Sequence, residues 1–480
     1  MAANVRMPVA VASPQRDSAI AAHRFGLGEP SLDGVGADPQ GWLLAQIGPA
    51  DAARGRGLLD TRAALELVAA ERDKRLAARN PPPGMTAEQL LAGHYREAIL
   101  ADARSRIATA AASNRPFAER LHLFWANHFT VSLAKGSVRG LVGAFERDAI
   151  RPNIAGPFET LLFASTTHPA MLRYLDNAQS AGPHSLLAAR AARSAARQGS
   201  EPRVVGLNEN LAREVLELHT LGAESTRQPG GSSSGRSSGY TQADVTAFAA
   251  VLTGWRVALH DQPDPAQRFD AAWHEPGAKT LLGKRYPEGP DALRMALHDL
   301  ALHPATARFL ATKLARHFVA DEPPPALVDA LASSYLDHAG ELAPVYRTLV
   351  AHPLAWQPEA AKLKTPEEFV VSAMRVLQRD EPGVFAAGIA GLGQRIHAAP
   401  SPAGWSDRAA DWLGPDAVWK RVEWATRVAD RIGASVDARE LAARSLGPLI
   451  GEATRTQIER AADGRQALAL LLLAPEFQRR

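Results

Sequence analysis

The chain has 480 residues, 46% of them hydrophobic, with a formal net charge of +3 at pH 7 and no cysteine. This length and hydrophobic content suffice for one large helical domain or for two or three smaller domains. The absence of cysteine excludes disulfides, thiolate metal ligands and a cysteine nucleophile. No run of residues approaches the roughly 18 apolar positions of a membrane span, so we expect no membrane-spanning segment.

Residues 1–17 are expected to form a disordered leader. Their short apolar patch is interrupted by Pro8 and lacks the continuous hydrophobic region of a signal peptide. The protein is therefore expected to be cytoplasmic. From residue 18 to residue 480 the sequence predicts a single helical domain.

The first 130 residues have a largely helical composition. Residues 52–79 favour a long exposed helix that the run Pro81–Pro83 ends, and a second long helix follows to about residue 112. The next helix begins at Pro116 and ends in two polar residues, Asn127 and His128, which are candidates for a functional site. The face that it is expected to bury carries Phe117, Leu121, Phe124, Trp125 and His128.

The same helix contains Glu119 and His122, spaced as in one half of a carboxylate-bridged di-iron site. The full site needs a second E-x-x-H and two further glutamates, and the sequence has no second E-x-x-H. We therefore expect an exposed ion pair here and no metal site.

Two polar residues, Asp176 and Asn177, follow an apolar helical run, where they either form an Asx turn at its end or belong to a site. Residues 181–204 are rich in Ala, Arg and Ser without an apolar stripe. We expect that segment to be a mobile basic loop that becomes helical only transiently.

The stretch 208–222, N-E-N-L-A-R-E-V-L-E-L-H-T-L-G, concentrates the most polar groups on one predicted helix. Its apolar stripe is Leu211, Val215 and Leu218, with Asn208 as N-cap and Gly222 at the C-terminus. Glu214 and His219 flank this stripe, so both should be partly buried and need partners. We expect the segments that carry His128 and Asp176–Asn177 to meet this helix and form one polar cluster.

A Gly/Ser-rich segment, 223–239, follows, and we expect it to be a mobile insertion or a flap. Thr241 and Asp244 then form a capping box for a helix that ends before Trp255. The turn-rich, aromatic stretch 269–286 predicts a small β-hairpin and carries His274 and Lys279.

The remaining sequence predicts further amphipathic helices. Three His-Pro dipeptides, at His168, His303 and His352, mark helix junctions, and Thr365-Pro366-Glu367-Glu368 is a strong helix start. In the Pro-rich segment 400–419, Trp405, Trp412 and Trp419 recur every seven residues. They either fasten a loop to the helical body or form a platform for stacking sugars. The fold class is therefore all-α, a single large multi-helix body with at most a small β-hairpin near 269–286.

From about Ala21 to Phe477 the chain resembles the domain of unknown function 1800 family, a large bacterial group. The resemblance implies a mainly helical fold and, for many members, export to the periplasm; it implies no particular reaction. This chain differs from the family in lacking an export signal and in carrying the Gly/Ser insertion before Tyr240. The matching strings are F-W-A-N-H-F, L-D-N-A-Q-S, the whole 208–222 stretch, Y-T-Q-A-D-V, L-T-G-W, H-E-P-G-A-K-T-L-L-G, H-P-A-T-A-R-F-L-A-T-K-L, K-L-K-T-P-E-E-F-V-V-S-A, P-S-P-A-G-W and A-P-E-F.

Two functions fit these residues. The first is an enzyme of the hydrolase or transferase type, in which Glu214 or Glu217 is the general acid or base and His219 or His128 is a second proton-transfer group. Arg213 would hold an anionic substrate. The other candidate substrate-binding residues are Asn127, Asp176, Asn177, Asn208, Glu209, Trp255, His274 and Lys279.

The second function is a non-enzymatic helical scaffold that binds a partner protein or a glycan. In that case the polar residues form structural ion pairs, since Glu209, Arg213 and Glu217 recur every four residues, as in any helix stabilised by such pairs. The arginines are spread through amphipathic helices, so we expect no nucleic-acid binding. The chain has no Walker loop, G-x-G-x-x-G or G-x-S-x-G motif, and its sequence identifies neither a cofactor nor a substrate.

Overall fold

The computed structural model describes residues 14–79, 86, 93–201, 206–223, 239–257 and 268–480. In these ranges the chain is mainly helical, as predicted. Its helices up to residue 252 are α1 (Pro14–Ile20), η1 (Ala21–Phe25), η2 (Leu32–Gly34), α2 (Pro39–Leu44), α3 (Thr61–Ala77), α5 (Arg96–Ala112), α6 (Pro116–His128), η3 (Gly136–Val138), α7 (Val142–Phe145), η4 (Glu146–Ile150), η5 (Arg151–Asn153), α8 (Phe158–Thr167), α9 (Pro169–Tyr174), η6 (Asn177–Gln179), α10 (Leu186–Gln198), α11 (Asn210–Glu214), η7 (Val215–Thr220) and α12 (Gln242–Leu252).

The rest of the described chain adds four short strands and a second series of helices. These elements are β1 (Trp255–Arg256), β2 (Arg268–Phe269), β3 (Lys279–Leu281), β4 (Lys284–Tyr286), α13 (Asp291–Ala301), α14 (Pro304–Phe318), α15 (Pro325–Asp337), α16 (Leu342–Ala351), η9 (Pro353–Trp356), α17 (Pro366–Val376), α18 (Pro382–Gly391), η10 (Ala409–Trp412), α19 (Pro415–Ile432), η11 (Gly433–Ser435), α20 (Ala438–Ser445), η12 (Gly447–Leu449), α21 (Glu452–Glu459), α22 (Gly464–Leu473) and α23 (Pro475–Gln478).

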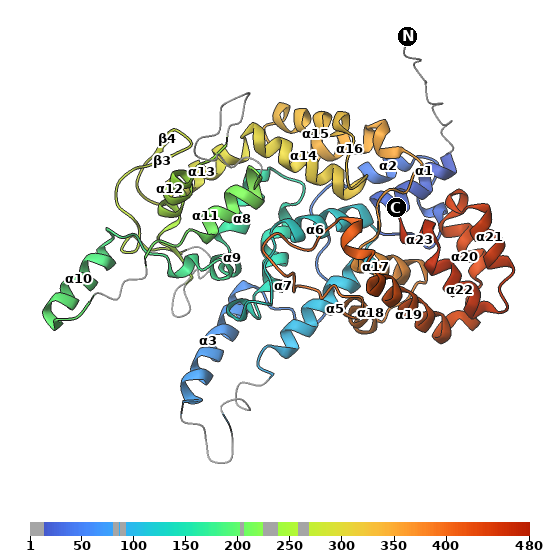
Figure 1. The fold of residues 1–480 in the computed structure, drawn as a ribbon, viewed down its shortest axis with the longest axis horizontal. Coiled ribbons are helices and arrows are strands. Elements are labelled where there is room, and N and C mark those ends of the chain that lie inside the picture. Colours follow the sequence, from blue (N-terminus) through green and yellow to red (C-terminus); the bar gives the residue numbers. More distant parts are fainter. Residues whose placement is uncertain (1–13, 80–85, 87–92, 202–205, 224–238, 258–267) are drawn as a thin grey trace, which may run out of the picture.

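The helices form an elongated body (Figure 1). Helices α8, α11, α12 and α13 lie at one end with the β3–β4 hairpin, α6 lies near the middle, and α17 to α23 lie at the other end. Helices α3 and α10 project from this body. None of the described helices combines the length and the apolar composition that a bilayer crossing requires.

Many helices begin where local sequence signals place them. Thr241 and Thr365 each form the predicted capping box, with Asp244 and Glu368 respectively. At the three His-Pro junctions the histidine is the N-cap, and its Nδ1 accepts the backbone N–H two residues later, at 3.1–3.2 Å. Proline at the first helical position then fixes the backbone for the turn.

The predicted hairpin is present as β3 and β4, which pair antiparallel with Lys279 opposite Tyr286. Its turn, Leu282–Gly283, has positive φ at both residues, and the backbone N–H of Leu282 donates to Asp244 at 2.7 Å. Asp244, which belongs to the capping box of α12, therefore also anchors the hairpin. A second, two-residue ladder pairs Trp255 with Phe269.

Buried apolar side chains form two clusters. The larger draws on residues between Ile20 and Ala355, and the smaller on α5 and on the helices from α17 onward. Helix α6 belongs to both, and Asn127 is its one residue that is not buried. Because α6 is buried on all sides, each of its polar side chains needs a partner from another element.

The expected leader and the expected mobile loop 181–204 differ in detail from the structure. Residues 1–13 of the expected leader lie outside the described residues, and its last part is already helical, because α1 begins at Pro14. Residues 186–198 of the expected mobile loop form α10, which Ser185 caps and Gly199 ends in a left-handed conformation. Most of 223–239 also lies outside the described residues.

The expectation of an exposed ion pair between Glu119 and His122 is wrong, because neither side chain is accessible to solvent. Glu119 pairs with Arg151 through two hydrogen bonds of 2.9 Å. His122 Nδ1 lies 4.0 Å from Glu119 and its Nε2 lies 3.7 Å from Glu146. The i, i+3 spacing is typical of a surface ion pair, but Pro116–Ala126 of α6 are all buried.

Candidate functional site

The end of α6, F-W-A-N-H, forms one wall of a cleft. Asn127 donates from Nδ2 to the carbonyl of Trp405 at 2.9 Å and accepts the backbone N–H of Trp405 at 2.8 Å. These two bonds fasten the loop 403–407 to α6. Gly404 allows the close approach, since its φ is +85° and a Cβ there would lie 2.5 Å from the carbonyl oxygen of Asn127.

The cleft lies between α6, α14, the start of α17 and this loop, and its volume is about 330 Å³. That is within the size range of small-molecule sites. Its polar lining comes from six separate parts of the chain. The charged and polar residues of the lining are Arg106, Asn127, His128, Lys313, Arg316, His317, Thr365, Glu367, Glu368, Gln394, Ser406 and Asp407.

A smaller cavity of about 30 Å³ lies beside the cleft and shares with it Arg106, Asn127, Glu367 and Trp405. Its own polar lining includes Glu146 and His397. His397 Nε2 is 3.2 Å from Glu146, and the backbone of His397 has a φ of +58°. A histidine held in this left-handed region is under backbone strain, which the surrounding contacts must maintain.

Three cationic or titratable residues of α14 face the cleft together. Lys313, Arg316 and His317 are spaced i, i+3 and i+4, so they share one side of the helix. Lys313 is half-buried and makes no hydrogen bond or ion pair with the part of the chain that the structure describes; its ammonium lies 5.5 Å from the Phe309 ring. Arg316 donates from Nε to the carbonyl of Asp321 at 3.1 Å.

Most carboxylates around the cleft are already neutralised by arginines. Arg106 bridges Glu146 and Glu367, with its Nη2 2.9 Å from Glu367. Glu368 accepts from Arg120 and, at 2.7 Å, from Arg480. These buried pairs hold α5, α6, η4 and α17 together, and they leave Asp407 as the lining carboxylate without an arginine partner among the described residues.

The predicted helix at 208–222 is present as α11 followed by the π-helical turn η7. The wider turn changes which residues face inward: Leu216 and His219 are buried, whereas Leu218 of the expected stripe is only half-buried. Gly222 has the expected positive φ, of 90°. π-Helical turns often accompany functional sites, and this one directs His219 toward α6.

His128 and His219 are brought together. His128 donates from Nε2 to the carbonyl oxygen of His219 at 3.1 Å, and the two ring centroids are 6.0 Å apart. His128 lines the cleft, and His219 lies behind it. Glu214 and Glu217 are half-buried next to one another and do not line the cleft, and neither makes a hydrogen bond within the described ranges.

Glu209 and Arg213 belong to a separate network on the surface between α11 and α12. Their ion pair measures 3.2 Å, and Glu209 also accepts from Gln242 at 2.7 Å and from Thr246 at 2.6 Å. Asn208 accepts the backbone N–H of Asn210 in an Asx turn, so it stabilises the helix start.

The remaining candidates lie around α12 and the hairpin. Asn177 donates to the carbonyls of Leu252 and Trp255, at 3.1 Å in each case. His274 binds the carbonyl of Thr253 through Nδ1 at 2.8 Å, and its Nε2 is 3.0 Å from the Lys279 ammonium. Asp176 pairs instead with Lys135. The residues expected to form one cluster therefore lie apart. His128 and His219 meet beside the cleft, Asp176 pairs with Lys135, and Asn177 lies against α12 and β1.

The sequence pattern of the family described as "Protein of unknown function (DUF1800)" matches residues 20–479. The chain belongs to this family. Searches of curated proteins and of solved structures found no match. The function of this DUF1800 protein must therefore be argued from its own residues.

The electrostatics of the cleft favour neutral imidazoles and a partly neutral lysine. Burial lowers the pKa of Lys313 to about 8, an effect that Asp407 opposes and Arg316 reinforces. Burial, and then the charge of Lys313, hold the pKa of His128 well below its usual value. Burial, and then the charge of Arg480, do the same for His317. Near neutral pH this DUF1800 protein therefore presents two uncharged histidines beside one titrating amine.

Sequence reasoning found Asn127 and His128 but missed Lys313, Arg316 and His317. A usable signal was present, because lysine is rare in this chain and these three residues share a side of one helix. The sequence left two interpretations of the tryptophan segment 400–419, a loop anchored to the helical body or a platform for stacking sugars. Trp412 is buried and donates to the carbonyl of Ser406 at 2.8 Å, whereas Trp419 is 62% exposed on α19.

No group of three or more His, Asp and Glu side chains in the described parts of this DUF1800 protein is arranged to hold a metal ion. Glu119, half of the possible di-iron pattern, has both carboxylate oxygens bound by Arg151. The donor set that remains in the cleft is suited to proton transfer and to binding anions.

Proposed function

We propose that the protein is an enzyme of the hydrolase or transferase type whose active site is the cleft between α6, α14, the start of α17 and the loop 403–407. The observation that carries this proposal is the Lys313 ammonium, which faces a 330 Å³ cleft without an ion-pair partner among the described residues. The neighbouring arginines of the cleft wall are held in buried ion pairs or backbone hydrogen bonds. A half-buried cation that makes no ion pair at such a wall is available to a ligand.

Lys313 is assigned the role of general base. Its pKa of about 8 makes a fraction of the side chain a neutral amine near neutral pH. That amine can accept a proton from water or from a substrate hydroxyl as the oxygen attacks, and the resulting ammonium can return the proton to the leaving group. Arg316 has its Nη groups available within the described structure and would bind an anionic group of the substrate.

The two histidines are assigned positioning roles. Because Nε2 of His128 donates to a backbone carbonyl, its Nδ1 is the unprotonated nitrogen, and it has no hydrogen-bond partner among the described residues. The Nε2 of His317 likewise lacks a partner there, at 4.0 Å from Glu368. Both nitrogens are buried and uncharged, so the two rings shape the cleft wall beside Lys313 and keep it free of positive charge.

The alternative function, a non-enzymatic scaffold that binds a partner protein or a glycan, is favoured by a different observation. Carboxylates of α6, η4 and α17 form ion pairs with buried arginines. Such pairs are expected where charged groups hold helices together. Glu214, the carboxylate first expected to be catalytic, has a pKa raised by burial and by Glu217 but does not line the cleft.

The proposal is tested first without a substrate. We expect the Lys313 amine to react with acetic anhydride with a pH midpoint near 8, below the usual lysine range, as followed by peptide mass spectrometry. Lys284 is the internal control, since its side chain is 55% exposed and pairs with Asp299 at 2.6 Å.

The second test compares activities on a panel of chromogenic carboxylic and phosphoric esters. Lys313→Met should reduce turnover by about a hundredfold or more while the melting temperature stays equal or rises, because a buried charge is removed. Lys284→Met should leave turnover unchanged. If Lys313 reacted with the same midpoint as Lys284, or if Lys313→Met retained full activity, the assignment of Lys313 would be wrong.

A further inference from the structure

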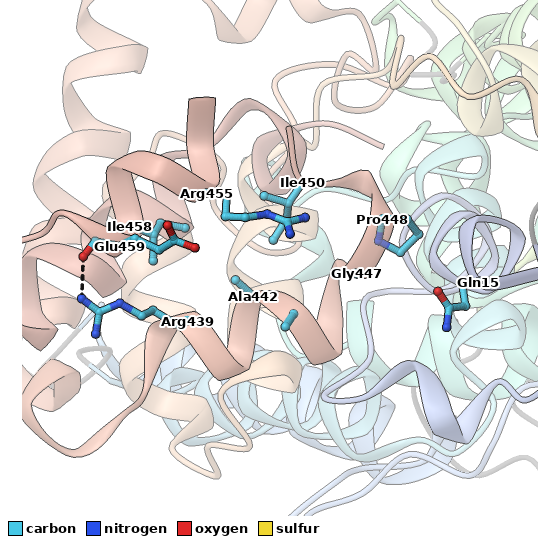
Figure 2. Close-up of a pocket in the computed structure, with 10 residues that line it drawn as sticks. Gln15, Arg439, Ala442, Gly447, Pro448, Ile450, Arg455, Ile458 and Glu459 are labelled. Atoms are coloured by element: carbon cyan, nitrogen blue, oxygen red, sulfur yellow. Dashed lines mark hydrogen bonds between the residues drawn. The ribbon is translucent and has the colours of Figure 1, made fainter. Parts of the chain in front are cut away.

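A second hollow lies between α20, α21 and α1 (Figure 2). Its volume is about 440 Å³, and it shares no lining residue with the cleft. Its wall comes from α1, α20, η12 and α21. Its lining includes Arg439, Ala442, Ile450, Arg455, Ile458 and Glu459.

The hollow exists because small residues line one side of it. Ala442 and Ala443 on α20 and Gly447 after it project little, and α21 faces them across the gap. Ile450 and Ile458 supply a buried apolar wall, with 8% and 2% of their surface exposed. An apolar chain inserted there would be removed from water on more than one side.

Two arginines stand at this apolar wall. Arg439 donates to the backbone carbonyl of Glu459 at 2.7 Å and so closes one end of the hollow (Figure 2). Arg455 extends along the hollow toward Ile450 and has no hydrogen bond or ion pair from its side chain within the described chain. The lining thus carries two guanidinium groups and one carboxylate, that of Glu459.

We propose that this hollow binds a small amphipathic anion, a single-chain carboxylate whose apolar part lies against Ala442, Ile450 and Ile458 and whose head pairs with Arg455. The apolar wall selects for an alkyl body, and the free guanidinium selects for an anionic head. The net positive lining disfavours a cationic head of the same length. This site would be independent of the reaction carried out in the cleft.

Isothermal titration calorimetry with octanoate tests the proposal on the full-length protein. We expect saturable one-to-one binding of octanoate, no detectable binding of acetate, which lacks the apolar body, and no detectable binding of octylamine. Octanol should bind at least about tenfold more weakly than octanoate, because it cannot pair with Arg455. Equal binding of octanol and octanoate would show that charge plays no part and would overturn the proposal.

Two variants locate the binding. Arg455→Gln should weaken octanoate binding about tenfold, and Ala443→Trp, at an exposed rim position, should abolish it by filling the hollow. Arg460→Gln is the matched control, because Arg460 is exposed just after α21 and does not line the hollow. Binding that is absent in the unmodified protein, or that both lining variants retain, would contradict the site.

Discussion

Buried charges on α6 are paired residue by residue. Glu119 has no exposed surface and binds both Nη groups of Arg151 at 2.9 Å, and Arg120 pairs with Glu368. Such pairs are weak evidence for net stability, because removing two charges from water opposes their attraction. Removing only one partner of such a pair is nevertheless strongly destabilising, because the other charge stays buried without compensation.

We therefore expect Glu119→Gln to lower the free energy of unfolding by about 3–5 kcal/mol, because Arg151 would remain buried without a carboxylate. Urea unfolding followed by circular dichroism measures this. The control is Glu66→Gln, which removes an exposed i, i+4 pair with Arg62 at 3.5 Å and should change stability by less than about 0.5 kcal/mol. Equal effects of the two substitutions would contradict the structural role assigned to Glu119.

The partners of these residues could not be read from the sequence. The spacing of Glu119 and His122 places them one turn apart on a helix, but it does not reveal that η4 and η5 cover that turn and supply Glu146 and Arg151. For Glu214 and His219 the apolar flanks correctly predicted at least partial burial. The side on which each lies depended on the π-helical turn η7, for which the sequence gives no clear signal.

Elements that are distant in sequence meet at the cleft, and a single glycine lets two of them touch. The loop 403–407 approaches α6 at Gly404, whose φ of +85° and tight contact with Asn127 exclude a side chain. The two Asn127–Trp405 hydrogen bonds depend on that approach. The position of Trp405 in the cleft wall thus follows from Gly404.

We expect Gly404→Ala to lower stability by about 1–3 kcal/mol, through backbone strain and a steric clash, and to make 403–407 the first site of limited proteolysis. Gly391→Ala is the matched control, because Gly391 ends α18 with open space around it and no positive φ. It should be neutral or stabilising by up to about 1 kcal/mol. A loop that stays protected from protease in Gly404→Ala would show that the approach does not require glycine.

Element boundaries were predictable wherever a local signal sets them. The capping boxes at Thr241 and Thr365 and the three His-Pro starts depend on groups within four residues of each other, so the sequence contains the whole interaction. The cleft was not predictable in this way. Its walls come from segments near residues 106, 127, 316, 367 and 405, which only tertiary packing brings together.

Over the whole molecule, buried histidines link stability to pH. Burial lowers the pKa of His23, His168 and His219 to about 3 in each case. The unfolded chain protonates these side chains near pH 6.5, so below that pH the unfolded state binds more protons than the folded state. Stability is therefore full above about pH 6.5 and falls as the pH decreases toward 3, by at most about 1.4 kcal/mol per pH unit for each histidine.

We expect the urea midpoint to decrease between about pH 7.5 and about pH 5.5, a range in which ordinary carboxyl groups contribute little. His168→Gln should reduce this pH dependence as well as the stability itself. A midpoint independent of pH in this range would mean that the buried histidines are protonated in the folded protein.

Helix η1 is held by segments that follow it hundreds of residues later, and this matters during synthesis. His23 Nε2 binds the carbonyl of Ser445 at 2.9 Å across 422 residues, and Arg24 binds the carbonyl of Ala355 across 331. At about 5–20 residues per second, the ribosome needs on the order of 20–80 s to make that intervening stretch. Ile20 and Phe25 are almost fully buried in the folded protein. During that time their apolar side chains are already synthesised, but much of the chain that covers them is not. Helices α1 and η1 are thus enclosed only after the segments around Ala355 and Ser445 have been made, and until then their apolar side chains can take part in aggregation.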